Sequence, residues 1–230
     1  NGTKCFITNA PIADKITLFA NTREGGGIRG LTVFLVDADT KGISIGKEED
    51  KMGIRASATA EIIFEDCFVP DSARVGKEGR GFMIAMQTLQ MSRPVVAAIS
   101  VGIAQAAIEA AVAYSHHRKQ FGVKIATFEM VQQMIADMVM KTEAARILTY
   151  KACVAQMNKD KKAGLYSAMS KCFASDTAME VTTTAVQVMG GNGYSRENPV
   201  EKYMRDAKIM QIYEGTNQVQ RLVIANETTF

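Results

Sequence analysis

One carboxylate in the C-terminal part of the chain has neighbours that suit acid–base chemistry. Glu214 stands between the aromatic Tyr213 and Gly215, directly before an apolar segment that begins after Thr216. Gly215 permits a positive φ or a close approach of the backbone to a ligand. Shielding by Tyr213 and Ile212 disfavours the charged form of a carboxylate and makes it a stronger base. Glu214 is therefore either a candidate general base or an ordinary acid at an exposed helix N-terminus.

A second candidate loop is Arg118-Lys-Gln-Phe-Gly122, which places a guanidinium beside an aromatic ring and a glycine that can reverse the chain. A guanidinium suits bidentate contact with phosphate better than an ammonium group does, so a pyrophosphate ligand fits here. The same residues are also typical of a helix C-terminus that ends on a left-handed Gly122. The sequence alone leaves both interpretations open.

A third candidate loop, Gln187-Val-Met-Gly-Gly-Asn-Gly193, follows a long helical segment. Its three glycines are more than a helix stop signal requires, and they would leave backbone amides open to a ligand. A sharp turn between two helices is the alternative. Motifs for other chemistry are missing: the sequence has no G-x-S-x-G, no G-x-x-x-x-G-K-[ST] and no H-E-x-x-H. Two adjacent histidines and isolated cysteines do not predict a metal site.

The segments that position these loops fall into two groups. Residues 1–75 contain short β-branched and aromatic runs separated by turn residues, with strands predicted over 5–8, 16–20, 31–36 and 61–65. From Gly79 onward, Ala, Met and Leu at helical spacing predict long helices. These are expected over 82–91, from Ser92-Arg-Pro94 to about His116, over 128–159 and over 165–189. A last helix follows Thr216 as N-cap, with Val219, Leu222, Val223 and Ala225 on its buried side.

This pattern predicts an α+β protein with two domains. Residues 1–77 would form a partial antiparallel β-sandwich or barrel, incomplete at its N-terminus, because turn residues at Asn1-Gly-Thr-Lys4 lead directly into a strand. Residues 78–230 would form an antiparallel four-helix-bundle domain.

Composition narrows the function class. The chain has 230 residues, of which 47% are hydrophobic and 22% charged, as in an ordinary globular protein. A net charge of +3 predicts neither a nucleic-acid partner nor an anionic membrane partner. We expect no membrane span, because charged or small residues interrupt every apolar run. The four cysteines are isolated, which predicts free, buried thiols in a reducing compartment.

Taken together, the loops resemble consecutive signatures of the flavin-dependent acyl-CoA dehydrogenases. The likeness rests on Arg118-Lys-Gln-Phe-Gly, Gln187-Val-Met-Gly-Gly-Asn-Gly, Met204-Arg-Asp-Ala-Lys and Ile212-Tyr-Glu-Gly-Thr-Asn-Gln, together with Phe6-Ile-Thr-Asn and Ser92-Arg-Pro-Val-Val-Ala-Ala. It covers essentially the whole chain and is greatest to the short- and medium-chain branch. It implies part of the family's middle β domain and its C-terminal helical domain.

The resemblance implies an enzyme that binds FAD and oxidises an acyl-CoA to trans-2-enoyl-CoA. Glu214 matches the family's base, which removes the pro-R α-hydrogen as a proton while the β-hydrogen leaves as hydride to flavin N5. The electrons then pass to an electron-transfer flavoprotein. Some branches carry the base near Ser92, but here that position is a serine with no acid beside it. Two alternatives remain, namely a decarboxylating dehydrogenase of the glutaryl-CoA type and a non-catalytic, oligomerising fragment.

The resemblance also implies ligand contacts. Those implied for FAD are Arg118, Gln120, Phe121, Gln187, Gly190, Gly191, Thr216, Gln218, Phe6 and Thr8, and those for acyl-CoA are Ser92, Arg93 and Gly215. Arg118 and Gln120 would reach the FAD of a neighbouring subunit, which implies a homotetramer built as a dimer of dimers. A role in fatty acid β-oxidation follows, in the cytoplasm of a bacterium or the mitochondrial matrix of a eukaryote. Three positions depart from the family pattern: Phe6 replaces tryptophan, Glu129 replaces glutamine and Asn226 replaces arginine.

Overall fold

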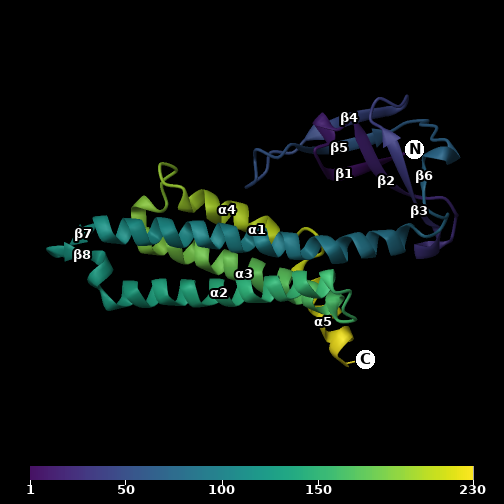
Figure 1. The fold of residues 1–230 in the computed structure, drawn as a ribbon. Helices are drawn as coiled ribbons and strands as arrows, with labels where there is room; N and C mark the ends of the chain where they lie inside the picture. The colour runs from purple at the N-terminus through teal and green to yellow at the C-terminus, as the bar shows by residue number, and fades with distance from the viewer. Residues whose placement is uncertain (230) are drawn as a thin grey trace. The chain divides into compact units, whose positions relative to one another are not determined.

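The computed structural model describes residues 1–229, which form two compact units (Figure 1). The first unit is Asn1–Thr88, and the second comprises the residues from Leu89 onward. This division concerns compactness alone, so the domain boundary predicted after residue 77 stays a prediction. The first unit holds two antiparallel sheets and the second the helical core, which confirms the predicted α+β class.

The first unit contains two small antiparallel sheets. One has the strand order β1 (Gly2–Thr8), β5 (Thr59–Phe64), β4 (Ile43–Glu48), and the other the order β2 (Lys15–Asn21), β3 (Leu31–Asp37), β6 (Arg74–Val75). Short 3₁₀ turns lie at Ala10–Ile12, Gly27–Gly30 and Asp71–Ala73. Alternate side chains of β2 and β5 enter a shared apolar core that includes Ile16, Leu18, Ala60 and Ile62.

All four predicted strands are present, whereas β4 was not predicted. Its apolar alternation is short, because Gly46 interrupts it and the pairing with β5 shifts register between Ile45 and Glu48. A bulge of this kind breaks the two-residue period on which strand prediction depends.

The second unit is built from long helices. They are α1 (Gly81–His117), whose first turns belong to the first unit, α2 (Glu129–Met157), α3 (Ala163–Met189), α4 (Val200–Met210) and α5 (Asn217–Thr229). A two-stranded hairpin of β7 (Lys119–Gln120) and β8 (Val123–Lys124) and a 3₁₀ turn at Ile125–Thr127 link α1 to α2, and another turn at Gly190–Asn192 ends α3. Figure 1 shows α1, α2 and α3 side by side. Buried alanines such as Ala107 and Ala178 share their core, because small side chains allow close helix packing.

The two helices predicted on either side of Ser92 are in fact one continuous helix, α1, with Pro94 inside it. Proline has no N–H to donate to the carbonyl four residues earlier, which here is that of Gln90. Gln156 of α2 supplies the missing donor, since its Nε2 lies 2.9 Å from the Gln90 carbonyl oxygen. A contact from another helix thus allows α1 to continue through the proline, and sequence periodicity does not register such a contact.

Helix α1 also corrects the expectation that every apolar run is interrupted. Among the described residues it is the one helix long and apolar enough to cross a membrane, with a mean hydropathy of 1.9 over its best 18-residue window. Of that window, 44% is buried within the chain, and Ala104, Ala107 and Ala111 pack in the helical core. We interpret α1 as a core helix.

The buried side predicted for α5 is wrong. Val219 is 45% exposed and Leu222 is 64% exposed, whereas the buried residues are the polar Asn217 and Gln220. The helix packs on α3 through hydrogen bonds of its first turn, so Val219 and Leu222 point outward, while Val223 is half-buried. The predicted N-cap is confirmed, because the Val219 amide donates to Thr216 Oγ1 over 3.3 Å.

The cysteines are all free, as predicted, but their expected burial is only partly right. Cys172 is buried, Cys67 and Cys153 are intermediate, and Cys5 is exposed on β1.

Candidate active site

The Glu214 loop joins α4 to α5 and has an uncommon backbone conformation. The Asn217 amide donates to the Gln211 carbonyl over 3.0 Å and closes the loop. Within it, Glu214 has a φ of 59° and Gly215 a φ of 90°. Glycine tolerates such a φ, but a glutamate there costs about 1–3 kcal/mol and persists only where the surroundings hold it. Left-handed non-glycine residues of this kind are concentrated at functional sites.

Helix α1 places two polar side chains against the loop. Ser92 Oγ donates a hydrogen bond to Oε2 of Glu214. Arg93 is only 8% exposed, and its Nε has no hydrogen-bond partner among the described residues. Burial lowers the pKa of the Arg93 guanidinium, against the attraction of the Glu214 charge. A carboxylate, a hydroxyl and a buried cation therefore meet at one point.

Two side chains, one from α3 and one from α5, hold the loop through three hydrogen bonds. Lys171 Nζ lies 2.9 Å from the Gly215 carbonyl oxygen and 2.8 Å from Asn217 Oδ1. Gln220 Nε2 donates to the same Gly215 carbonyl over 3.0 Å. A Cβ atom on Gly215 would lie only 2.6 Å from Gln220 Nε2, so a side chain here would displace the Gln220 amide in addition to straining φ.

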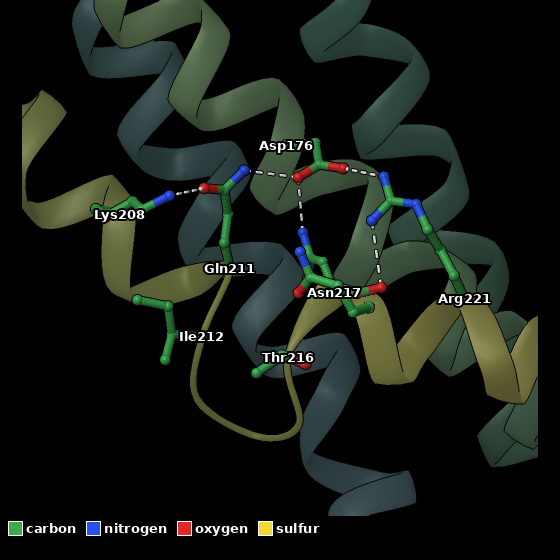
Figure 2. A pocket seen from close by; sticks show the side chains of 8 residues that line it. Asp176, Lys208, Gln211, Ile212, Thr216, Asn217 and Arg221 are labelled. Atoms are coloured by element: carbon green, nitrogen blue, oxygen red, sulfur yellow. Dashed lines mark hydrogen bonds and ion pairs between the residues drawn. The ribbon is translucent and has the colours of Figure 1, made fainter.

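A cluster of polar side chains surrounds Asp176 and includes Asn217, which Lys171 also binds. Figure 2 shows Gln211, Asn217 and Arg221 converging on the Asp176 carboxylate, with hydrogen bonds of 2.6–2.7 Å. Burial alone would raise the pKa of Asp176, but these hydrogen bonds and the Arg221 charge hold it below its ordinary value. The cluster borders a cavity of about 480 Å³, which is lined by Asp176, Lys208, Gln211, Ile212, Thr216, Asn217, Gln218 and Arg221.

A second cavity, of about 460 Å³, brings together the two other candidate loops. Arg118 and Gln120 line it with Gln187, Gly190 and Gly191. The Arg118 loop is the β7–β8 hairpin, with Phe121 and Gly122 at positive φ, so the left-handed Gly122 serves a hairpin turn instead of a helix C-cap.

This second cavity suits an anionic ligand. The Arg118 guanidinium has no hydrogen-bond or ion-pair partner within the described residues, although it lines the cavity. Gly190 has a φ of 58°, and a Cβ atom built on either Gly190 or Gly191 would meet no atom within 4 Å. Open backbone beside a free guanidinium is the arrangement that phosphate groups prefer.

The comparison with known proteins now identifies the chain. A family model described as "Acyl-CoA dehydrogenase, C-terminal domain" matches residues 79–228, and one described as "Acyl-CoA dehydrogenase, middle domain" matches residues 1–67. The chain belongs to the acyl-CoA dehydrogenase family.

Individual relatives agree. The short-chain specific acyl-CoA dehydrogenase of Clostridium acetobutylicum is 48% identical over 231 residues, which cover 99% of this chain and 60% of that protein. The solved structure of butyryl-CoA dehydrogenase from Megasphaera elsdenii is 48% identical with a TM-score of 0.97, over 100% of this chain and 60% of that chain. A chain from a study of the electron transferring flavoprotein of Acidaminococcus fermentans is 52% identical with a TM-score of 0.97, over the same shares. The chain thus spans about three fifths of the length of these three relatives.

The structure gathers most of the residues that the resemblance to acyl-CoA dehydrogenases implied. Ser92, Arg93, Glu214 and Gly215 form one group, Thr216 and Gln218 face the first cavity, and the Arg118 and Gly190 loops share the second. Phe121 does not line that cavity; it is 92% exposed and meets Phe128 edge-on, with 6.2 Å between ring centroids. Phe6 and Thr8 are exposed on β1 of the first unit, and Phe6 has a φ of 54°. Their ligand roles remain predictions.

The sequence analysis did not identify the residues that support the Glu214 loop. Lys171, Asp176, Asn217 and Gln220 were not singled out. For Lys171 a signal exists, because it stands in helical phase with the buried Ser167, Ala168, Ala174, Ser175 and Ala178 of α3. A lysine on such an inward face predicts a buried polar contact.

Proposed function

We propose that the enzyme carrying this chain is an FAD-dependent acyl-CoA dehydrogenase in which Glu214 removes the α-proton of the acyl thioester. The observation that supports this most is the Glu214 loop itself. Its carboxylate extends from a left-handed backbone position, beside Ser92 and the buried Arg93. Hydrogen bonds from Lys171 and Gln220 hold the loop. A fixed carboxylate partly shielded from water is what general-base catalysis needs.

Each side chain around the Glu214 carboxylate has a separate role. The Ser92 hydroxyl binds Oε2 of Glu214 and leaves Oε1 to accept the α-proton. Proton transfer converts the carboxylate to a carboxylic acid and leaves the substrate with the electron pair of the broken C–H bond. The buried Arg93 guanidinium lies near enough to Glu214 for the two charges to attract each other.

FAD fits the second cavity. Arg118, Gln120, Gln187 and the backbone at Gly190 and Gly191 would hold its pyrophosphate and adenosine part, because they combine a free cation with open amides. Thr216 and Gln218 would contact the cofactor at the first cavity. When bound, FAD would supply the two-electron oxidant for removal of the β-hydrogen.

The two groups of FAD ligands belong to different chains in this proposal. Lys171, beneath the Glu214 loop, and Gln187, in the second cavity, are sixteen residues apart on α3, or about 24 Å at 1.5 Å per residue. A homotetramer with shared sites would bring Arg118 of one chain to the Glu214 site of another. We further propose a short acyl-CoA substrate, as in the butyryl-CoA dehydrogenase relative, and an electron-transfer flavoprotein as acceptor. A role in β-oxidation, in the cytoplasm of a bacterium or in the mitochondrial matrix of a eukaryote, completes the proposal.

Substitution of the base tests this function. In the FAD-loaded, full-length enzyme, Glu214→Gln should lower kcat by about 10²–10⁴-fold, the usual contribution of a general base, while the flavin content stays unchanged. Glu227→Gln is the matched control, because Glu227 is an exposed acid near the end of α5. Turnover of Glu214→Gln equal to that of the control would show that the base lies elsewhere.

A further inference from the structure

Lys171 is buried, and within residues 1–229 it forms no ion pair with a carboxylate. Its side chain is 0% exposed, on the face of α3 that supports the Glu214 loop. A buried lysine normally pairs with a carboxylate, but this ammonium group donates to two neutral oxygens, the Gly215 carbonyl and Asn217 Oδ1. Burial lowers the pKa of Lys171 to about 8, so the folded chain bears a desolvation cost to keep the charge there.

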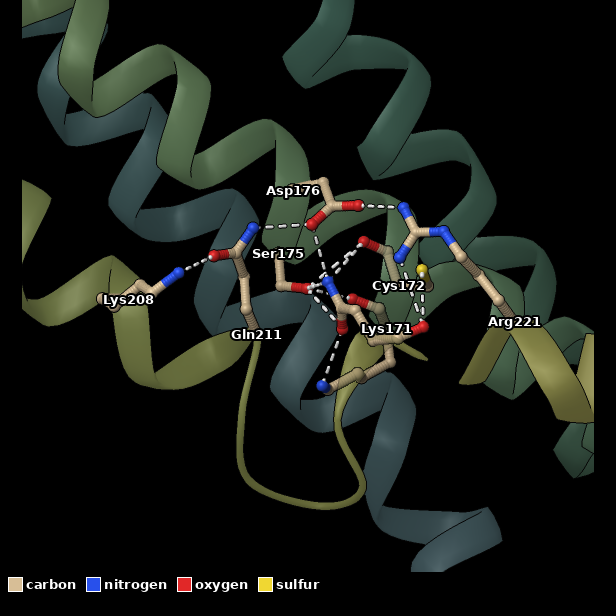
Figure 3. Close-up of polar contacts among 8 residues, drawn as sticks. Lys171, Cys172, Ser175, Asp176, Lys208, Gln211 and Arg221 are labelled. Atoms are coloured by element: carbon tan, nitrogen blue, oxygen red, sulfur yellow. Dashed lines mark hydrogen bonds and ion pairs between the residues drawn. The ribbon is translucent and has the colours of Figure 1, made fainter. Parts of the chain in front are cut away.

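The side-chain amide of Asn217 is held in one orientation, with Oδ1 toward Lys171. Its Nδ2 donates to Asp176 Oδ1 over 2.7 Å and to Ser175 Oγ over 2.8 Å. Figure 3 shows Lys171 reaching from α3 toward this group, with Ser175 and Asp176 above it in the view. The acceptor that the lysine uses on α5 is therefore oriented in advance by other side chains.

The two oxygens that Lys171 binds follow Glu214 closely in the chain. Gly215 is the second of the two left-handed residues, and Asn217 is the first residue of α5. Removing the ammonium group removes one hydrogen bond from each, so the loop loses two of the contacts that offset its backbone strain and keeps those from Gln220. A displacement of the carboxylate by about 1 Å is enough to cost up to 10²-fold in rate.

From this geometry we propose that Lys171 is the positioning residue for Glu214. Its buried ammonium group, through the Gly215 carbonyl and Asn217, holds the Glu214–Gly215 pair in the left-handed conformation that aims the carboxylate at the substrate. Lys171 touches neither substrate nor cofactor in this account, and its role rests on the proposed function of Glu214.

The first test is Lys171→Met in the FAD-loaded, full-length enzyme. We expect kcat to fall about 10–100-fold while KM stays within about threefold and the flavin content is unchanged. Lys171→Arg, which keeps a cation and several donors, should recover part of the loss. Lys161→Met is the control, because Lys161 is exposed in the turn between α2 and α3. A kcat of Lys171→Met within threefold of wild type, or a loss explained wholly by lost flavin, would overturn the proposal.

A pH profile separates positioning from a merely structural role. The charged and titratable groups that face Lys171 are Arg93 of α1, Glu214 of the loop, and Cys172 and Asp176 of α3. As the pH rises through about 8, Lys171 loses its proton, and kcat of the wild type should decline. Lys171→Met should lack this alkaline decline. A decline present in both proteins, or in neither, would contradict the proposal.

Measurement of Glu214→Gln in parallel distinguishes failure of the positioning role from failure of the proposed function. If Glu214→Gln is inactive while Lys171→Met behaves as wild type, only the positioning role is wrong. If Glu214→Gln remains active, the proposed function itself fails, whatever Lys171→Met does.

Discussion

At the scale of single residues, Gly215 has two constraints at once. Its φ of 90° disfavours any side chain, and a Cβ atom would lie 2.6 Å from Gln220 Nε2, a donor to the Gly215 carbonyl. Gly102 of the helical unit has neither constraint. At Gly102, inside α1, an added Cβ would meet no atom within 4 Å.

Alanine substitutions at these two glycines should therefore have opposite effects. Gly215→Ala should destabilise the enzyme by about 1–3 kcal/mol and lower kcat, because the loop must shift to relieve strain. Gly102→Ala should stabilise it by about 0.5–1 kcal/mol, as expected for an exposed helix interior, and leave kcat unchanged. Urea unfolding and steady-state kinetics measure both effects. Equal stability of the two variants would contradict the assigned loop conformation.

The burial of Lys171 also predicts a dependence of stability on pH. The folded chain releases the Lys171 proton near pH 8, whereas an unfolded chain keeps it up to the ordinary value of 10.5. Between these values the unfolded state binds more protons, so the contribution of Lys171 to the free energy of unfolding rises with pH. Below pH 8 the desolvation cost is fully present.

Comparison with Lys171→Met isolates this contribution. The difference in unfolding free energy, wild type minus Lys171→Met, should increase across the window by up to about 3 kcal/mol. Urea unfolding at the two ends of the window measures it. A difference that is flat, or that decreases as pH rises, would show that Lys171 is not buried as a cation.

At the scale of elements, α1 depends on α2 to pass Pro94. The Gln156 amide donates both to the Gln90 carbonyl, which proline leaves without its helical partner, and to Ser167 Oγ over 2.8 Å. Because Ser92 and Arg93 lie within this turn of α1, the same contact orients the side chains that face Glu214.

Gln156→Leu should destabilise the protein by about 1–3 kcal/mol, because it leaves a part-buried carbonyl without a donor. It should also lower kcat, since the turn that carries Ser92 loses its support. Gln133→Leu, at an exposed position of the same helix, is the matched control. Thermal unfolding of the two variants tests this, and an equal melting temperature would refute the role of Gln156.

The sequence predicted elements well where one periodic signal dominated. The alternation in β2 and β3 and the helical spacing of α2 and α3 were sufficient for those elements. It failed where a distant group decided the outcome. Gln156 keeps α1 continuous at Pro94, and Asn217 and Gln220 turn the polar side of α5 inward.

The residues of the candidate site also differ in how far the sequence could predict them. Glu214, Arg118 and Gly190 could be selected because local motifs carry their chemistry. The helical phase of Lys171 indicates burial, but the partners of Lys171 and Asp176 could not be predicted, since they lie thirty-five or more positions away in the sequence.

At the scale of the whole molecule, the second cavity and the Glu214 loop lie about 24 Å apart along α3. This separation predicts complementation between two inactive variants. Arg118→Glu should lose FAD from the site that it serves, and Glu214→Gln should lose the base. If each site combines Glu214 of one chain with Arg118 of another, mixed oligomers contain some sites with neither substitution.

Co-expression of the two variants should therefore restore part of the activity that each lacks alone. Mixing the same purified homo-oligomers without subunit exchange is the control and should restore none. Activity that stays absent in verified mixed oligomers would place Arg118 and Glu214 in the site of a single chain.

The central claim is that Glu214 takes the α-proton, and exchange of that proton with solvent measures it most directly. The full-length, FAD-loaded enzyme is incubated with acyl-CoA in deuterated water without an electron acceptor, and deuterium at the α-carbon is followed by mass spectrometry. The wild type should introduce deuterium there, while Glu214→Gln, with its flavin retained, should do so about 10²–10⁴-fold more slowly. Exchange at the wild-type rate in Glu214→Gln would contradict the account.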